Sequence, residues 1–258
     1  MKLSAADMHP PKDTAEAKIM TFRRSLIMSL EYAVVNFRPE ASFHGTTLCM
    51  FLTYPNEQVE VLGLQMLKYF GATKNLGFGY SPGDDQITGG ESESPDGWFD
   101  SSWVVHDPLT KAKSISGQVF RQFNGPILWS AKGQQAQSVS SAGAELTSLI
   151  NGVSNGISVR GLAYEYNIPQ LYPTKMFTDN AAAVFIAEDA ASVKRSKAEA
   201  RHAIFMQECV EEGLFQMKHW PGKANIADIL TKWLSRHDFE RHRAILINMK
   251  AHRDLGLV

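Results

Sequence analysis

Hydrophobic positions recur at helical spacing throughout the first third of the chain. Between Thr14 and Phe37, apolar residues follow one another at steps of three and four, which is typical of an amphipathic helix. Arg38-Pro39 ends this helix, because the residue before a proline disfavours helical backbone. A second helix is predicted from about Ala41 to Leu52, and a third from Pro55 to about Phe70, where Gly71 ends it. This part of the chain is therefore predicted to be all helical.

After residue 97 the pattern changes to short strands, which then alternate with helices. Three strands are predicted at Trp98–Val105, Ser114–Phe123 and Ile127–Ala131, and Asn124-Gly125 between the last two is a strong hairpin signal. The remaining predicted elements are a helix at Ala142–Tyr166, a strand at Pro173–Thr178, helices at Asn180–Glu188 and Lys197–Gly213, a strand at Leu214–Trp220, and helices at Ile226–Leu234 and Phe239–Leu255. An antiparallel start followed by strands that helices separate predicts an α/β fold, with a mixed five-stranded sheet flanked by helices.

A stretch rich in glycine, serine, proline and acidic residues separates these two patterns. Residues 80–97 include Ser81-Pro82-Gly83 and Gly89-Gly90, which favour turns, so we expect a flexible surface connector here. The predicted organisation is then a helical block at 1–79, the connector at 80–97, and an α/β domain at 98–258 that ends in a C-terminal helix.

Composition and charge limit the classes of protein to which the chain can belong. It has 258 residues, of which 44% are apolar, so it can bury a sizeable core. A formal net charge of -1 gives no overall attraction to nucleic acid, so any such contact must come from local basic patches. No run approaches the ~20 apolar residues of a membrane span. Cys49 and Cys209 lie far apart, which favours a reduced intracellular compartment and indicates no zinc site.

Four acidic residues lie at junctions between the predicted elements. Asp179 follows a predicted buried strand, and Asn180 behind it can cap the next helix. This position is the C-terminal edge of the sheet, where open α/β sheets bind ligands. The other three acids, Asp100, Glu145 and Asp228, are at comparable junctions. We expect the four carboxylates to converge on bound metal.

Carboxylates that cluster repel one another and need a cation of high charge to stay ionised. Oxygen ligands suit Mg²⁺ or Mn²⁺, and two such ions ~4 Å apart can stabilise the attacking and leaving oxygens of a phosphodiester displacement. Each acid also has an ordinary explanation when it is taken alone. Asp179 could simply start a helix, Glu145 could complement a helix dipole, Asp100 could be a turn or edge residue, and Asp228 a solvated charge.

A basic run precedes and enters the helix predicted at Lys197–Gly213. It comprises Lys194, Arg195, Lys197 and Arg201, and one interpretation is a contact for the phosphate backbone of nucleic acid. A solvated helix start explains the same residues equally well. For His219, at the end of a predicted strand, we expect a structural role.

Several short motifs occur in one order along the chain. They are Leu67-Lys68-Tyr69-Phe70-Gly71, Gly97-Trp98-Phe99-Asp100-Ser101-Ser102-Trp103, Ser114-Ile115-Ser116-Gly117-Gln118-Val119-Phe120, Ser140-Ser141-Ala142-Gly143-Ala144-Glu145, Thr178-Asp179-Asn180 and Ala227-Asp228-Ile229-Leu230-Thr231-Lys232. In this order they resemble the C-terminal part of a copia-type retrotransposon Pol polyprotein, where the end of the reverse transcriptase precedes a ribonuclease H domain. The resemblance covers nearly the whole chain after residue 20.

The resemblance implies a fold, an activity and a set of site residues. The α/β domain would have the ribonuclease H-like fold, and the helical block would be a remnant of the reverse transcriptase thumb or connection. Asp100, Glu145, Asp179 and Asp228 would be the catalytic acids that bind two Mg²⁺ or Mn²⁺ ions. Such an enzyme cuts the RNA strand of an RNA–DNA hybrid, which it recognises by shape and 2′-hydroxyl groups.

The resemblance also implies where the protein acts and with what. The partners would be an RNA–DNA hybrid and, as a candidate, the reverse transcriptase polymerase domain, with no membrane and no small-molecule cofactor. The compartment would be intracellular, either the cytoplasm, in a virus-like particle, or the nucleus.

Departures from the family pattern leave two other interpretations open. Ser102 stands where the family has a second aspartate, and Gly143 where it has a glutamate, although neither belongs to the four acids. The chain has no Tyr-x-Asp-Asp motif, so no polymerase activity is expected. The alternatives are a catalytically inactive or host-captured remnant that binds nucleic acid or protein, and a structural subdomain that works only with the polymerase.

Overall fold

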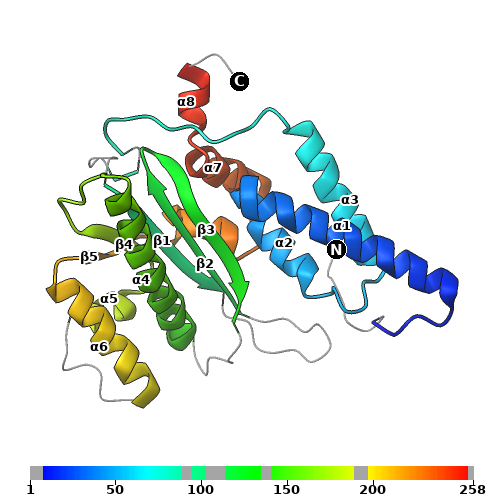
Figure 1. The fold of residues 1–258 in the computed structure, drawn as a ribbon, viewed down its shortest axis with the longest axis horizontal. Helices are drawn as coiled ribbons and strands as arrows, with labels where there is room; N and C mark the ends of the chain where they lie inside the picture. Colours follow the sequence, from blue (N-terminus) through cyan, green and yellow to red (C-terminus); the bar gives the residue numbers. More distant parts are fainter. Residues whose placement is uncertain are drawn as a thin grey trace.

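A five-stranded mixed sheet is the centre of the second half of the chain (Figure 1). The computed structural model describes residues 8–85, 87–88, 94–102, 114–134, 141–188 and 197–254; at 141–147, 182–183, 186, 188, 197–202 and 252–254 it describes the backbone alone. The spatial order is β3-β2-β1-β4-β5. The strands are β1 (Asp96–Ser102), β2 (Ile115–Gln122), β3 (Gly125–Gly133), β4 (Thr174–Thr178) and β5 (Phe215–His219).

Strand directions confirm the mixed sheet that the sequence predicts. β1 is antiparallel to β2 and parallel to β4, and β4 is parallel to β5. The turn of the β2–β3 hairpin lies one residue earlier than expected, at Phe123 and Asn124, which both have positive φ, whereas Gly125 already belongs to β3. A Cβ at Gly125 would come within 2.5 Å of the Tyr80 ring, so a close contact explains this glycine.

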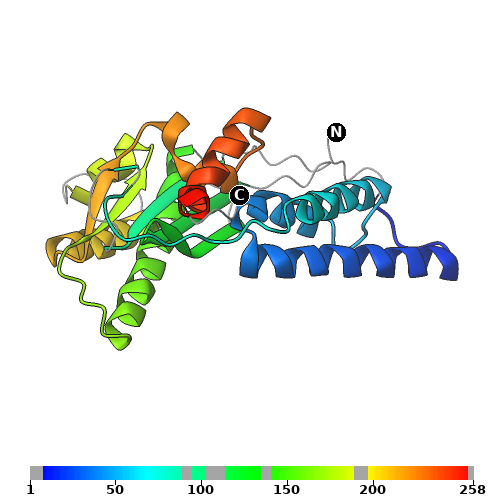
Figure 2. The ribbon, with the colours of Figure 1, turned by 90° about the horizontal axis from the view of Figure 1, so that it is seen from above.

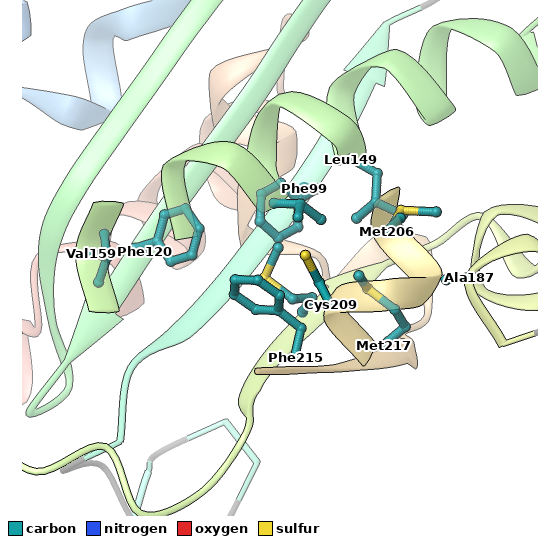
Figure 3. Packing of buried hydrophobic residues seen from close by; sticks show 11 residues of the cluster. Phe99, Phe120, Leu149, Val159, Ala187, Met206, Cys209, Phe215 and Met217 are labelled. Carbon is teal, nitrogen blue, oxygen red and sulfur yellow. The ribbon is translucent and has the colours of Figure 1, made fainter. Parts of the chain in front are cut away.

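Three helices pack on one face of the sheet: α4 (Ser141–Glu165), α5 (Ala181–Glu188) and α6 (Lys197–Glu211). Their apolar side chains meet those of the strands in one core (Figure 3). Phe99 and Phe120 contact each other edge to face within this core, with ring centroids 5.6 Å apart. The core fixes the strand ends that carry the candidate site, because Phe99 directly precedes Asp100.

The opposite face is covered by the C-terminal segment, which differs from the prediction. The helix expected at Ile226–Leu234 is a short 3₁₀ helix, η4 (Ile226–Leu230), which follows a first 3₁₀ turn, η3 (Gly222–Ala224). The single helix expected at Phe239–Leu255 is two helices, α7 (Arg236–Leu246) and α8 (Met249–Asp254). Asn248, which lies between α7 and α8, has φ of 52° and interrupts the helical backbone. Trp98 stacks on Phe177 beneath this segment, with centroids 4.3 Å apart.

Residues 14–72 form the predicted helical block. Its elements are α1 (Thr14–Phe37), a 3₁₀ turn η1 (Pro39–Ala41), α2 (Ser42–Cys49) and α3 (Glu57–Ala72). Asn56 caps α3 by accepting a hydrogen bond from the Val59 amide, and Gly71 lies inside this helix instead of ending it. In the described part of the chain, no helix is both long and apolar enough to cross a membrane, the 24-residue α1 included.

The helical block lies to one side of the sheet and packs against β3 (Figure 2). The Trp129 indole donates to the Val34 carbonyl at 3.0 Å, and the Thr46 hydroxyl donates to the Ala131 carbonyl at 2.8 Å. The segmentation of the chain into three parts stays a prediction.

Two residues of the expected connector, Ser81 and Asp85, are bound to the β2–β3 hairpin. The Ser81 amide donates to the Phe123 carbonyl at 2.8 Å, and buried Asp85 forms an ion pair with Arg121 of β2. β1 begins at Asp96, two residues earlier than the expected domain boundary.

Candidate active site

Asp100 and Asp179 meet at the C-terminal edge of two parallel strands. Asp100 lies in β1, the central strand, and is only 1% exposed. Asp179 directly follows β4, and the parallel register pairs Phe99 with Thr178, one residue before each acid. Because parallel strands end at the same edge of a sheet, the two carboxylates are neighbours, as the junction positions predict.

Asn225 brings the third acid, Asp228, to the same place. Its side-chain amide donates to the Phe99 carbonyl at 2.8 Å, and its side-chain oxygen accepts from the Ala227 amide at 3.1 Å. The second bond caps η4, so Asn225 holds the start of this 3₁₀ helix against β1. Thr231, at the end of η4, donates its hydroxyl to Asp100 Oδ2. Asp228 therefore lies beside Asp100, although 128 positions separate them.

Lys232 is a residue of this site to which the sequence analysis assigned no role. Its Nζ lies 2.8 Å from Asp228 Oδ1 and 3.5 Å from Asp100 Oδ2. Burial lowers the pKa of Lys232, but the three neighbouring carboxylates outweigh burial and hold it above its usual value. The available signal was its spacing, because residues four apart can pair on one helical face.

Burial and a neighbouring carboxylate raise the pKa of two of the acids, Asp228 and Asp179. Burial and the Asp100 carboxylate raise the pKa of Asp228 to about 6, although Lys232 opposes the shift. Burial and Asp100 also raise the pKa of Asp179, again against Lys232. Each of the two carboxylates therefore experiences the negative charge of its neighbours, as expected for a cluster that has more acids than bases.

The loop after β5 closes around Asp179. His219 Nε2 lies 3.1 Å from the Asp179 carbonyl, and the Trp220 amide donates to the Thr178 carbonyl at 2.8 Å. A Cβ built on Gly222 would be 2.8 Å from Asp179 Oδ2, so any larger residue would displace this carboxylate. The hydrogen-bond contact of His219 at this site is with backbone, and its expected structural role stays a prediction.

Glu145 is described by its backbone alone, which lies near the start of α4. One turn later, the Ser148 hydroxyl donates to the Asp100 carbonyl at 3.1 Å, so this part of α4 packs against β1. Residues three apart share one face of a helix, which puts Glu145 on the face of Ser148. Among the side chains that the structure describes, no group of three or more histidine, cysteine or acidic residues is arranged to hold a metal ion, and Glu145 is not among those side chains.

The predicted basic contact for nucleic acid falls largely outside the description. Lys194 and Arg195 lie outside the described residues, and Lys197 and Arg201 are described only as backbone positions in α6. Their role stays a prediction.

The strand order, the strand directions and the helices on both faces define an α/β protein of ribonuclease H-like architecture. The chain is similar to the retrovirus-related Pol polyprotein from transposon RE1 of Arabidopsis thaliana, with 27% identity over 217 residues. It is also similar to that from transposon RE2 of the same plant, with 25% identity over 217 residues. The two alignments each cover 84% of this chain, and the chain spans 14% of the length of each polyprotein.

The chain is therefore related to a segment of retrotransposon Pol polyproteins, which confirms the resemblance that its motifs indicated. No protein-family model and no solved structure matches it.

Proposed function

We propose that this chain is a metal-dependent endonuclease of the ribonuclease H type, which hydrolyses the RNA strand of RNA–DNA hybrids. The observation that carries the proposal is the convergence of Asp100, Asp179 and Asp228 around one lysine. Three carboxyl groups lie beside a single lysine, so the acids outnumber their base. A purely structural ion pair would need one carboxylate for Lys232.

Carboxylate oxygens, which Asp100, Asp179 and Asp228 offer, are the ligands that Mg²⁺ and Mn²⁺ prefer. Asp100, Asp179 and Asp228 would hold the ions, with Glu145 of α4 as the fourth ligand. Two bound ions would supply an activated water and would neutralise the charge that develops on the cleaved phosphodiester. Burial and the neighbouring Asp100 carboxylate raise the pKa of Asp228, and a divalent cation beside it would oppose both effects, which supports this assignment.

The protein holds its carboxylates in position before any cation arrives. The Thr231 hydroxyl restrains Asp100 Oδ2, and Asn225 restrains the backbone of Phe99. Lys232 compensates part of the charge and keeps Asp100 and Asp228 together. A fixed arrangement of ligands lowers the cost of orienting the reacting groups.

The test is cleavage of a labelled RNA–DNA hybrid with Mg²⁺. Asp100→Asn is expected to lower the rate ~10²-fold or more, because a metal contributes several kcal/mol to such a transition state. Asp238→Asn is the matched control, since Asp238 is a half-exposed acid of α7 that pairs with Arg241. An all-DNA duplex should stay intact. Equal cutting by the wild type and Asp100→Asn would refute the assignment.

A second candidate function is a non-catalytic module that binds nucleic acid or protein. Lys232 favours it, because its ammonium already neutralises part of the cluster at 2.8 Å from Asp228. Tight binding of the hybrid without any Mg²⁺-dependent turnover would support this alternative. If turnover required a reverse transcriptase polymerase domain in trans, that domain would be the partner and this chain its dependent subunit.

A further inference from the structure

One face of α1 is open to solvent along most of the helix. α1 lies on the outside of the helical block, with α2 and α3 packed on its other side (Figure 2). Six large apolar side chains of α1 are between 47% and 66% exposed: Ile19, Phe22, Met28, Tyr32, Val35 and Phe37. Together with the exposed Ser25 and Ser29, they form the surface that we call the α1 face. The proposed function leaves this surface without a role.

The charged residues of α1 turn away from this face. Between positions 19 and 37 the helix has three of them, Arg23, Arg24 and Glu31. Arg23 pairs with Glu60 of α3 at 2.8 Å. Arg24 donates to two backbone carbonyls in the segment between α2 and α3, and Glu31 lies against Gly45 of α2. The solvent side of a surface helix ordinarily carries charged residues, so an apolar face without them indicates a partner.

The size of the α1 face suits an interface between two proteins. Six side chains that each expose about half of their surface present ~600 Å² of apolar area, which equals the largest such patch on a typical monomer. Two copies that paired through this face would bury on the order of 1,200 Å², the lower end of the range for specific interfaces. A second copy of the chain is therefore sufficient to cover the face, in a dimer that forms reversibly.

Large and small side chains are arranged so that the α1 face complements itself. Its residues recur at steps of three and four, the spacing at which two helices pack side by side. In an antiparallel pair with a two-fold axis between positions 28 and 29, each large residue faces a smaller one of the second copy: Tyr32 faces Ser25, Met28 faces Ser29, and Phe22 faces Val35. Such alternation lets the side chains of the two helices interdigitate. A parallel pair would instead put Tyr32 against Tyr32.

Charge favours the same antiparallel arrangement. Lys18 is the one charged residue at the exposed positions of α1 between 18 and 37. The last turn of α1 has no basic residue, although the C-terminus of a helix carries partial negative charge. In the antiparallel pair, Lys18 of each copy lies beside this end of the other helix. A parallel pair would bring two Lys18 ammonium groups together, at a cost in repulsion.

We propose that the α1 face is a dimer interface, in which α1 packs antiparallel against α1 of a second copy of this chain. The aromatic rings of Phe22 and Tyr32 are its anchors, because large exposed rings contribute most to such contacts. Asp100 and Asp228 lie in other elements, so each copy keeps its own acid cluster. Dimerisation of this kind is independent of any nuclease activity.

The test is sedimentation-velocity centrifugation of the full chain between about 1 and 100 µM, the range in which an interface of this size should assemble. Tyr32→Glu puts a charge into the apolar face, and Ser25→Lys puts an ammonium opposite Tyr32 of the second copy. The double variant S25K/Y32E pairs these charges twice across the axis. The matched controls are Tyr164→Glu and Ser158→Lys, at exposed positions of α4. Circular dichroism melting checks that all five variants fold.

We expect Tyr32→Glu and Ser25→Lys each to raise the dissociation constant of the dimer about 10-fold, because the two-fold axis makes each change act twice. The double variant should return to within about 3-fold of the wild type, since its opposite charges meet. Both controls should dimerise as the wild type does. A wild type that stays monomeric throughout this range, a dimer that neither single variant weakens, or a double variant no tighter than the single ones would each overturn the proposal.

Two other occupants of the α1 face would show themselves with a monomeric wild type. Binding to phosphatidylcholine vesicles that Tyr32→Glu abolishes would assign the face to a lipid surface. Binding to a reverse transcriptase polymerase domain in trans, again lost with Tyr32→Glu, would assign it to that domain. Either result would overturn the dimer.

Discussion

Lys232 joins two carboxylates that would otherwise repel each other. Its Nζ contacts Asp228 at 2.8 Å and Asp100 at 3.5 Å, and its side chain is 42% exposed. A lysine in this position performs part of the task of a metal ion, since it supplies positive charge to the cluster. Removal of Lys232 should therefore lower the stability of the metal-free protein and increase the stabilisation that a bound metal ion provides.

The variant Lys232→Met tests this role. In EDTA its free energy of unfolding should fall by about 1–2 kcal/mol, because the change leaves partly buried carboxylates unpaired. Added Mg²⁺ should raise the melting temperature of the variant more than that of the wild type, because no ammonium competes for the oxygens. The measurement is thermal melting with and without Mg²⁺. An identical Mg²⁺-induced shift in both proteins would show that Lys232 and the ion do not share ligands.

Gly222 controls the position of a single carboxylate. Gly222→Ala would put a Cβ 2.8 Å from Asp179 Oδ2, and the carboxylate can rotate away at little cost in stability. We expect the free energy of unfolding to change by less than about 0.5 kcal/mol, while hybrid cleavage falls about 10-fold, since one ligand is displaced. Gly161→Ala in α4 is the matched control, because its Cβ would meet nothing within 4 Å. Equal rates for the two variants would argue against a role for Asp179.

Residue positions along the chain predicted part of this site. Asp100 and Asp179 follow apolar strand residues, and such junctions reliably fall at a sheet edge. Lys232 could not be assigned in the same way, since a lysine four residues after Asp228 is an ordinary surface pair on the helix that the periodicity predicts. Only the 3₁₀ geometry of η4 and the contact with Asp100 show where its ammonium lies.

Asp96, the first residue of β1, makes the stability of the folded protein depend on pH. Burial raises the pKa of Asp96 to about 6 from its usual 3.8, against the opposing effect of Arg121. A raised pKa in the folded state means that protonated Asp96 favours folding. This contribution is full below pH 3.8 and is lost as the pH rises through about 6. Burial would raise the pKa of Asp85, but Arg121 and two backbone amides outweigh burial and lower it. Ionised Asp85 therefore favours folding, and this contribution is lost as the pH falls.

Asp96→Asn should remove the loss of stability that occurs as the pH rises from 3.8 through about 6. Asparagine keeps an oxygen that can accept the hydrogen bond from the Trp98 indole, which lies 2.9 Å from Asp96 Oδ1. The variant should be more stable than the wild type at about pH 7, and the difference should vanish at about pH 4. Urea unfolding at the two pH values provides the measurement. If the variant and the wild type differed in stability by the same amount at both pH values, protonation of Asp96 would not be the cause of the difference.

Element boundaries were hardest to predict where distant segments decide them. Apolar periodicity supports one helix over Phe239–Leu255, but the chain breaks it at Asn248. The side chain of Asn248 is fully buried and donates to the Ser81 hydroxyl at 3.1 Å, a partner 167 positions away. The spacing of apolar residues near Asn248 cannot predict this long-range hydrogen bond. By contrast, α1 was predicted at its observed bounds, because a long amphipathic pattern and Arg38-Pro39 define it locally.

The two halves of the molecule share hydrogen bonds that no local pattern could foresee. Trp129 of β3 donates to the carbonyl of Val34 in α1, and Thr46 of α2 donates to the carbonyl of Ala131 in β3. Trp129 also packs edge-on against Phe78, with centroids 5.3 Å apart. The helical block and the sheet should therefore unfold together.

Trp129→Phe tests this coupling, because phenylalanine keeps an aromatic ring and loses the N–H donor. The free energy of unfolding should fall by about 1 kcal/mol. In the wild type, urea transitions followed by circular dichroism and by tryptophan fluorescence should coincide. Two separate transitions in the wild type would mean that the block folds on its own.

The spacing of the acids along the chain has a consequence for biosynthesis. The ribosome synthesises Asp100 early, whereas its partners Thr231 and Lys232 are made 131 and 132 residues later. Until residues 231 and 232 have been synthesised, the carboxylate of Asp100 has neither the hydroxyl donor nor the counter-charge that the folded protein gives it. The nascent polypeptide therefore cannot assemble this cluster, or any chemistry that depends on it, until position 232 has left the exit tunnel.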